Sequence, residues 1–403
     1  MDPHTVTKSR ILLPAPTDMM RELIALPSVS SAQPSLDMSN MTVLDQLRNW
    51  LDDLGFTTRL QPVSQGPDKA NLIATLGEGS GGLVLAGHTD TVPWDEQRWQ
   101  CDPFAGEVRE DRLYGLGSAD MKSFLALAIH AASRVRRQDL KQPLIILATA
   151  DEECSMAGAR ALARAGSLPA RMAIVGEPTG LRPVRLHKGI MMERIRVIGR
   201  SGHSSNPELG RNALEGMHQV ITALLALRAQ LSERYHHPGF AVPSPTMNLG
   251  HIHGGDNPNR ICGECELHLD LRLLPGMAIE QTRSWIREAA ESALGDSGLR
   301  LDYSPLFEGT APMETPADSP LVAVVEQLTG HPAGGVNFGT EGPFYRQMGM
   351  DTVILGPGNI DQAHQPDEYL DLNQMAPTLE LLESLIRHFC LTPHPAQTGS
   401  AGK

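Results

Sequence analysis

The sequence has no long apolar run, few cysteines and no excess of positive charge. Nowhere in the 403 residues are there the roughly 18 consecutive apolar residues that a membrane-spanning helix needs. With 34 basic and 47 acidic side chains, the formal charge is −13, which leaves no basic excess to neutralise the phosphates of a nucleic acid. We therefore expect no membrane or nucleic-acid partner, and a small molecule as the ligand.

Cysteine is sparse and odd in number, with residues 101, 154, 262, 265 and 390. Such a set fits a reducing compartment better than a disulfide scaffold, and the apolar patch near the N-terminus is too short for a secretory leader. We therefore predict a cytoplasmic protein. Cys262 and Cys265 form a C-x-x-C pair, but the segment around them alternates like a strand. We expect the two thiols on opposite faces rather than in a redox or zinc motif.

Length and pattern together predict two domains. A chain of 403 residues exceeds the roughly 250 to 300 residues at which one core stops growing. Apolar runs alternate with helical stretches in the first part of the chain and again after about residue 300, which predicts an α/β domain whose mixed sheet is flanked by helices. Between them, a β-α-β-β-α order predicts an inserted α+β domain. We expect one discontinuous domain of residues 1–183 and 301–403, and a second domain of residues 184–300.

Polar residues follow the ends of several predicted strands, where ligands bind in α/β sheets. The run GGLVLAGHTD reaches His88, and Asp90 lies two residues later. In an extended segment both side chains share a face, so the Asp90 carboxylate can accept a hydrogen bond from one nitrogen of His88 while the other nitrogen binds a metal ion. A surface His–Asp pair explains this short pattern equally well.

Acidic residues stand at two further boundaries. Asp120 follows a glycine-rich stretch and precedes a helix, a place where an Asp often serves only as the N-cap. Glu152 and Glu153 are adjacent just beyond the apolar run PLIILATA. Burying two carboxylates side by side is costly without cations, so we predict that one binds metal and the other acts as general base on water. A solvated acidic loop is the alternative.

Two more positions complete a candidate metal site. Glu177 follows the short apolar run MAIVG, and His364 lies in a polar loop after a strand. The candidate donors are then two imidazoles and three carboxylates, namely His88, Asp120, Glu153, Glu177 and His364. This mixture of nitrogen and oxygen donors suits Zn²⁺, and Co²⁺ or Mn²⁺ could substitute for it.

One histidine outside this set is also a candidate. His203 lies in the Gly/Ser-rich turn GRSGHSS. A lone loop histidine is commonly solvated or structural, but an imidazole brought over the metal ions could stabilise the oxyanion of a tetrahedral intermediate.

As a set, the motifs HTDTVP, GLGSADMK, ADEE, GEPTG, GRSGHSS and AHQPDEYL resemble those of the M20 metallopeptidase/deacylase family, over about residues 18 to 390. Longer stretches are most similar to the members that deacetylate N-acetyl-L-ornithine. The resemblance implies a dinuclear zinc hydrolase that releases acetate and L-ornithine in arginine biosynthesis. It also implies a homodimer in which the inserted domain is the lid and dimerisation domain. Ser123 stands where the family commonly has Gly, and we expect only a small local change in packing.

The resemblance implies a role for each position. His88 and Glu177 complete one metal site, Glu153 and His364 complete the other, and Asp120 bridges the two. Glu152 is the implied general base, and Asp90 is the carboxylate behind the metal ligands. His203 is implied to polarise the scissile carbonyl, often from the partner subunit. Arg272 and Asn259 fall where related deacylases bind the substrate carboxylate.

Other functions stay open on the sequence. Within the family they are the desuccinylation of succinyl-diaminopimelate, the deacylation of another N-acyl amino acid, and the hydrolysis of short peptides. A different class is a metal-binding protein that kept the fold and lost catalysis. The presence of all five donors together with Glu152 and His203 argues against that class.

Overall fold

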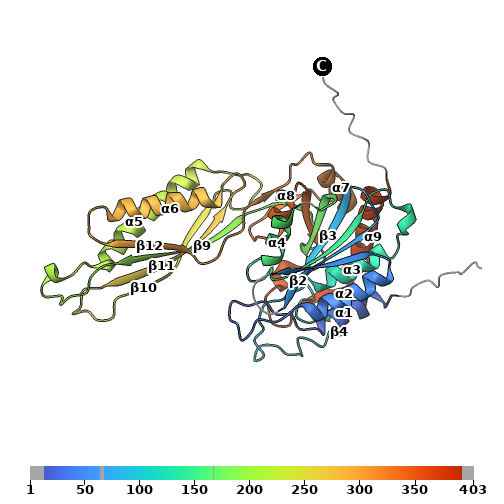
Figure 1. The fold of residues 1–403 in the computed structure, drawn as a ribbon, viewed down its shortest axis with the longest axis horizontal. Helices are drawn as coiled ribbons and strands as arrows, with labels where there is room; N and C mark the ends of the chain where they lie inside the picture. The colour runs from blue at the N-terminus through green and yellow to red at the C-terminus, as the bar shows by residue number, and fades with distance from the viewer. Residues whose placement is uncertain (1–12, 64–67, 167, 393–403) are drawn as a thin grey trace, which may run out of the picture. The chain divides into compact units, whose positions relative to one another are not determined.

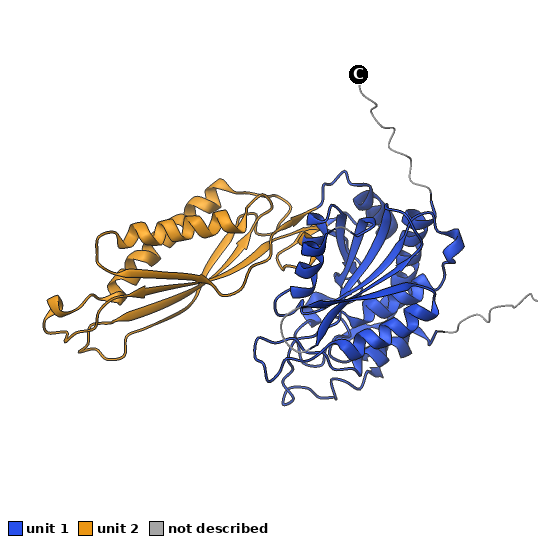
Figure 2. Ribbon diagram, in the orientation of Figure 1, with its two compact units in different colours: residues 1–184, 315–333, 344–403 blue, residues 185–314, 334–343 orange. Residues whose placement is uncertain are grey.

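The computed structural model describes residues 13–63, 68–166 and 168–392, and the chain divides into two compact units (Figure 2). Unit 1 comprises Met1–Val184, Thr315–Ala333 and Phe344–Lys403, and unit 2 comprises Arg185–Glu314 and Gly334–Pro343. Residues 1–12, which bear on the predicted absence of a leader, lie outside the described part.

The predicted domain boundary at residue 300 differs from the observed division. Strand β12 (Arg300–Pro305) pairs with β9 (Gly189–Ile198), so unit 2 continues to Glu314. A short strand after a helix carries no sequence signal for the sheet that it joins, which explains the early boundary.

A mixed sheet forms the centre of unit 1 (Figure 1). Four strands lie parallel in the order β6 (Leu144–Thr149), β3 (Gly82–His88), β7 (Ala170–Pro178) and β15 (Asp351–Gly356). Strands β2 (Lys69–Leu76) and β1 (Thr57–Val63) extend the sheet antiparallel beyond β6. On the other side, β15 pairs antiparallel with the start of β8 (Val184–His187). This arrangement is the predicted α/β fold class.

The apolar runs become strands that are buried along their whole length. Every residue of β3 and β6 is buried, as expected of parallel strands covered on both faces. One core cluster joins these strands to helices α1, α2, α3, α7 and α9. The helices of unit 1 are α1 (Pro16–Ile24), α2 (Met41–Asp53), α3 (Lys122–Ala132), α4 (Ala157–Ala165), α7 (Pro320–Thr329) and α9 (Met375–Ile386); α8 (Gly342–Gln347) begins in unit 2 and ends in unit 1.

A small antiparallel sheet lies apart from the central one. It has the order β16 (Tyr369–Asp371), β5 (Arg112–Tyr114) and β4 (Glu107–Arg109). Tyr369 pairs with Tyr114, so the chain after His364 is tied to the chain that leads into Asp120.

Unit 2 is an antiparallel sheet with two helices. The strand order is β10 (Thr246–Gly254), β11 (Glu264–Leu273), β9 and β12. Buried and partly exposed residues alternate along β9 and β11, so one face packs against α5 (Ala213–Arg234) and α6 (Ile279–Leu294) in a second core cluster. In the same unit, β13 (Met313–Glu314) and β14 (Gly334–Val336) pair with β8.

The expectation for the C-x-x-C pair was wrong in its geometry. Cys262 precedes β11 instead of lying in it, and both Cys262 and Cys265 are buried in the core of unit 2 as free thiols. Among the described residues, neither belongs to a group of donors that could hold a metal ion.

No helix in the described part of the chain is long and apolar enough to cross a membrane.

Candidate active site

The parallel strands of unit 1 bring the predicted donors to one edge of the sheet. His88 is the last residue of β3, Glu177 lies near the end of β7, and Glu152 and Glu153 follow β6. Because neighbouring parallel strands end at the same edge, side chains far apart in sequence meet there. Asp120 precedes α3, and His364 lies in the loop after β15.

Three buried donors form a first group. One ligand atom each from His88, Asp120 and Glu177 lies within 4.8 Å of the others. The Nε2 atom of His88 lies 3.0 Å from Oδ1 of Asp120. A second group consists of Asp120, Glu153 and His364, by the same 4.8 Å criterion. The two groups share Asp120.

Asp120 presents a different oxygen to each group. Its Oδ1 faces His88, and its Oδ2 lies 3.7 Å from Nε2 of His364. The same His364 nitrogen lies 2.9 Å from Oε2 of Glu153. A carboxylate that directs one oxygen to each of two donor groups has the arrangement needed to bridge two cations.

His88 is oriented differently from the sequence expectation. Its Nδ1–H donates to the backbone carbonyl oxygen of Asp90 at 3.0 Å, whereas the nearest carboxylate oxygen of Asp90 is 3.7 Å away. Since a carbonyl only accepts, this contact fixes the proton on Nδ1 and leaves Nε2 free to coordinate. The hydrogen bond that we expected His88 to donate to the Asp90 carboxylate is therefore accepted by the backbone carbonyl of Asp90.

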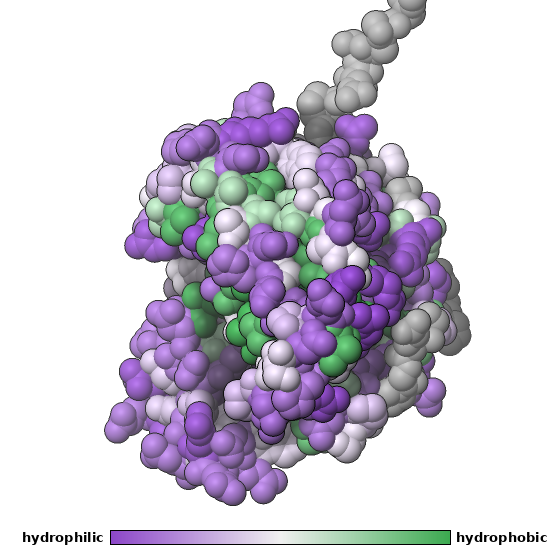
Figure 3. All heavy atoms as spheres, turned by 90° about the vertical axis from the view of Figure 1, so that its left-hand side faces the viewer, coloured by the Kyte–Doolittle hydropathy of each residue, from purple (hydrophilic) through white to green (hydrophobic). Residues whose placement is uncertain are grey.

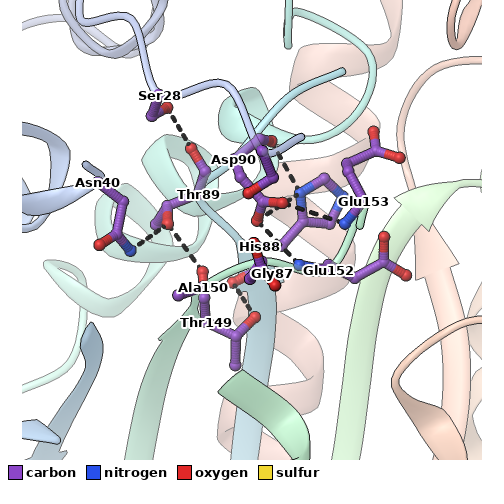
Figure 4. A network of polar contacts seen from close by, with 12 residues as sticks. Ser28, Asn40, Gly87, His88, Thr89, Asp90, Thr149, Ala150, Glu152 and Glu153 are labelled. Atoms are coloured by element: carbon purple, nitrogen blue, oxygen red, sulfur yellow. Dashed lines mark hydrogen bonds and ion pairs between the residues drawn. The ribbon is translucent and has the colours of Figure 1, made fainter. Parts of the chain in front are cut away.

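The Asp90 carboxylate instead holds the turn that bears the two glutamates (Figure 4). Its Oδ1 accepts the backbone N–H of Glu152 at 3.2 Å, and its Oδ2 accepts that of Glu153 at 3.0 Å. Asp90 is 1% exposed. A buried carboxylate that satisfies two backbone N–H groups fixes the turn, and thereby the backbone from which both glutamate side chains project.

The same network extends behind the site. In Figure 4, Thr89 links β3 to its neighbours, donating from Oγ1 to the carbonyl of Thr149 at 2.7 Å and accepting from Asn40 at 2.8 Å. Ser28 donates to the Thr89 carbonyl at 2.6 Å. These bonds keep the end of β3 from shifting relative to β6.

A buried ammonium group supports the other side of the glutamate turn. Lys69, with a side chain 3% exposed, lies 2.7 Å from Oδ1 of Asp151 and 2.6 Å from Oδ1 of Asp37. Asp151 has a positive φ of 62° and accepts the backbone N–H groups of Ser155 and Met156. Sequence reasoning missed Lys69, because an isolated lysine at a strand start carries no distinctive pattern.

Burial and mutual proximity shift the pKa values of these groups. Burial opposes protonation of His88, but the hydrogen bond to Asp120 and the neighbouring carboxylates hold its pKa well above the ordinary value. The hydrogen bond to Glu153 raises the pKa of His364 to about 9. Burial and the charge of Asp120 raise the pKa of Glu153. The carboxylates thus attract positive charge strongly, which is the property of a cation site.

Charge and donor chemistry fit two divalent metal ions. Four carboxylates, those of Asp90, Asp120, Glu153 and Glu177, have side chains that are largely buried together. Their charge matches that of two divalent cations, whereas without cations such burial is costly. The mixed imidazole and carboxylate set suits zinc and chemically similar metals.

Three predicted residues belong to unit 2. His203 is exposed; its Nδ1 lies 2.7 Å from Oγ of Ser205 and accepts the backbone N–H of the same residue at 3.2 Å. Asn259 lies beside it, since its carbonyl accepts the N–H of Ser204 at 3.0 Å. Arg272, near the end of β11, donates from Nε to Asp270 at 3.0 Å.

Ser123 is buried in the first turn of α3. Its hydroxyl has no hydrogen-bond partner among the described residues. The effect of this serine on the neighbouring Asp120 stays a prediction.

Comparison with known proteins decides the family. The model of peptidase family M20/M25/M40 matches residues 84–388. The chain belongs to this family. This M20 chain is 50% identical over 378 residues to an acetylornithine deacetylase of Edwardsiella ictaluri, covering 94% of this chain and 98% of that protein. It is 49% identical over 381 residues to an acetylornithine deacetylase of Proteus mirabilis, with the same coverage.

Solved structures share the fold of this M20 chain. A tripeptidase from Staphylococcus aureus superposes with a TM-score of 0.71 at 18% identity, covering 93% of this chain and 97% of that one. A dinuclear metal-binding M20 peptidase from Bacillus subtilis superposes with a TM-score of 0.65 at 16% identity, covering 92% and 97%. At these identities the likeness establishes the fold alone.

Proposed function

We propose that this M20 chain hydrolyses the amide of N-acetyl-L-ornithine to acetate and L-ornithine, with two divalent metal ions as cofactors. The observation that carries this proposal is the pair of donor groups that share Asp120, next to the turn that bears Glu152. The identity of about half to acetylornithine deacetylases over nearly the whole chain supports the choice of substrate.

The proposed ligands follow the two groups. His88 and Glu177 would hold one metal ion, Glu153 and His364 the other, and Asp120 both. We infer zinc from the donor types, with Co²⁺ or Mn²⁺ able to replace it. Ions bound there supply Lewis acidity toward the amide carbonyl and lower the pKa of a coordinated water.

Glu152 is proposed as the general base. The Asp90 carboxylate accepts the backbone N–H of Glu152, and the negative charge of Glu152 is among those that raise the pKa of His88. Glu152 would accept a proton from the attacking water and later donate it to the leaving amine. Because the backbone of Glu152 is held by a buried neighbour, only its side-chain torsions remain to be fixed for this step.

Residues of unit 2 are proposed to bind the substrate. The Nε2–H of His203 would donate to the carbonyl oxygen as negative charge develops on it. Arg272 would pair with the α-carboxylate, and Asp270, which accepts from Nε, orients the guanidinium for this contact. Asn259, next to His203 in the same turn region, would add an amide contact.

We also propose that two copies associate through unit 2, which would act as the lid and dimerisation domain. Strand β10 stands at the end of its sheet, and an open strand edge is a template for pairing with another strand. Ile252 on β10 and Leu214 and Leu225 on α5 are 52%, 46% and 38% exposed. The face drawn in Figure 3 is mostly hydrophilic, with hydrophobic residues gathered in a few patches. A second copy of β10 would satisfy the edge and cover apolar side chains.

The proposed reaction belongs to arginine biosynthesis in the cytoplasm. The decisive experiment measures metal content together with hydrolysis of a panel of N-acyl substrates. We expect about two metal ions per chain and the highest kcat/KM for N-acetyl-L-ornithine. If succinyl-diaminopimelate, another N-acyl amino acid or a dipeptide is turned over faster, that compound is the substrate and N-acetyl-L-ornithine is not.

Glu152→Gln separates an enzyme from a protein that only binds metal. We expect the variant to keep its metal content and to lose about 10²- to 10⁴-fold in kcat, the usual range for a general base. If wild type hydrolyses none of the substrates while binding two metal ions, the chain is a binding protein and the proposed reaction is wrong.

A further inference from the structure

Glu368 is a buried carboxylate that the proposed reaction does not use. It is 2% exposed and lies directly before β16. Its Oε1 accepts the backbone N–H groups of Ala119 and Asp120 at 2.7 and 3.0 Å, and its Oε2 accepts that of Gly117 at 3.0 Å. Three N–H groups of one short loop therefore converge on a single side chain.

We propose that Glu368 is a positioning residue for Asp120, the donor that the two metal groups share. This inference rests on the proposed metal centre. All three partners of Glu368 are backbone N–H groups, so its two carboxyl oxygens act as acceptors in every one of these contacts. A loop held at residues 117, 119 and 120 has little freedom left to turn the Asp120 side chain away from His88 or His364.

The main chain reinforces this contact. The carbonyl oxygen of Glu368 accepts the N–H of Gly115 at 3.0 Å, and the next residue, Tyr369, pairs with Tyr114. Glu368 thus lies next to the paired residue Tyr369. Both its backbone and its side chain contact the loop that leads to Asp120. Without an acceptor, three buried N–H groups would lose their partners, and the loop would have to rearrange to satisfy them.

The same segment carries a metal donor of its own. His364 lies four residues before Glu368 and contacts Glu153 at 2.9 Å. One short stretch of chain therefore places His364 directly and Asp120 through its backbone. The second metal group, which contains both residues, depends on this stretch more than the first group does.

The chain offers a matched control in the neighbouring residue. Asp367 also accepts a backbone N–H with its carboxylate, that of Gln100 at 2.8 Å. This contact leads to a different loop and not to Asp120. Asp367→Asn therefore repeats the chemical change of Glu368→Gln, one residue away, without touching the support of the metal donor.

The experiment titrates metal-depleted protein with Co²⁺ and follows the visible absorption of the bound ion. For wild type and Asp367→Asn we expect two equivalents and the same spectrum. For Glu368→Gln, whose amide turns an N–H₂ group toward a backbone N–H, we expect one equivalent to bind about 10- to 100-fold more weakly, with an altered spectrum. We also expect kcat to fall while KM changes little.

Each outcome bears on one claim. If wild type takes up no Co²⁺, the proposed function fails first. If wild type binds two equivalents and Glu368→Gln does the same with an unchanged spectrum, only the positioning role is overturned. Should Glu368→Gln not fold, Glu368→Asp keeps the charge with a shorter reach. A wild-type affinity and spectrum in Glu368→Asp would then contradict the proposal.

Discussion

The carboxylate of Asp90 accepts the backbone N–H of Glu153 at 3.0 Å. A residue just beyond β3 thereby fixes the turn that follows β6, and the same carboxylate also accepts the N–H of Glu152. Asp90 hydrogen-bonds His88 with its backbone carbonyl, whereas its carboxylate stays 3.7 Å from Nδ1. Its side chain therefore contributes to the site chiefly by placing the proposed base and one proposed ligand.

Asp90→Asn tests this role. The amide keeps one acceptor and turns N–H₂ toward the other backbone N–H, so the turn should shift. We expect kcat for N-acetyl-L-ornithine to fall about 10- to 100-fold, as is typical when a residue supporting metal ligands is changed. Asp102→Asn is the control, because Asp102 holds the N–H of Phe104 on an exposed loop. Equal kinetics for both variants would contradict the assignment.

Lys69 should be essential for stability, unlike cations in exposed ion pairs. Lys69→Met leaves Asp37 and Asp151 without their buried partner, and breaking a buried pair costs about 3 to 5 kcal/mol. In Arg136→Met the lost pair with Asp139 is largely exposed, so solvent screening should leave little loss of stability. Urea unfolding of both variants measures the difference, and a similar loss in each would show that Lys69 is not critical.

Metal removal should lower the free energy of unfolding. Asp120, Glu153 and Glu177 lie together, so without cations their charges repel one another. A ligand that binds only the native state, and is present at 100 times its Kd, raises the free energy of unfolding by about 2.7 kcal/mol. We expect a chelator to lower the Tm of wild type. Asp120→Asn should gain less in Tm than wild type on adding Zn²⁺, because it lacks the carboxylate that the two donor groups share. A wild-type Tm that is unchanged by the chelator would contradict the proposed metal centre.

Association through β10 is tested by a charge on this strand. Ile252→Asp places a carboxylate where apolar area would be buried, and such burial is costly. Sedimentation should give a dimer for wild type and a monomer for the variant. The control is Val108→Asp, at a residue that is 46% exposed in unit 1. A wild-type monomer, or a dimer that survives Ile252→Asp, would exclude this interface.

The sequence predicts the strand ends because strands buried on both faces leave continuous apolar runs. LIILA is apolar throughout, so both the α/β class and the place of Glu152 and Glu153 could be derived from such runs. The role of Asp90 could not. The expectation assumed that the strand runs through residue 90, but β3 ends at His88, and Nδ1 of His88 meets the backbone carbonyl of Asp90.

The support that Glu368 gives to the loop before Asp120 could not be predicted from the sequence either. Glu368 lies in a polar stretch that reads as an exposed loop, and its three donors are contributed by residues about 250 positions away. Local patterns cannot encode which N–H groups converge in space, since this depends on the pairing of β16 with β5. A buried acid in a polar stretch becomes visible only once the fold is known.

His187 should make the stability of unit 2 depend on pH. Its Nδ1–H donates to the carbonyl of Lys188 at 2.8 Å, while Nε2 is buried with no hydrogen-bond partner in the described part of the chain. Burial lowers the pKa of His187 to about 4. The unfolded chain has the ordinary value of about 6.5, so between these values the unfolded state binds more protons, and stability falls as the pH drops from 6.5 toward 4.

His187→Phe removes this proton uptake while keeping a buried ring. From pH 7 to pH 4, wild type should lose about 3 kcal/mol more than the variant, the free energy equivalent of the shift over that range. Protonation of the carboxylates affects both proteins alike and cancels in the difference. Urea unfolding at several pH values measures it, with His236→Phe, at an exposed imidazole, as the control that should follow wild type. A buried neutral imidazole must take up its proton on unfolding in that range. If His187→Phe nevertheless loses stability as steeply as wild type, the acid sensitivity arises elsewhere.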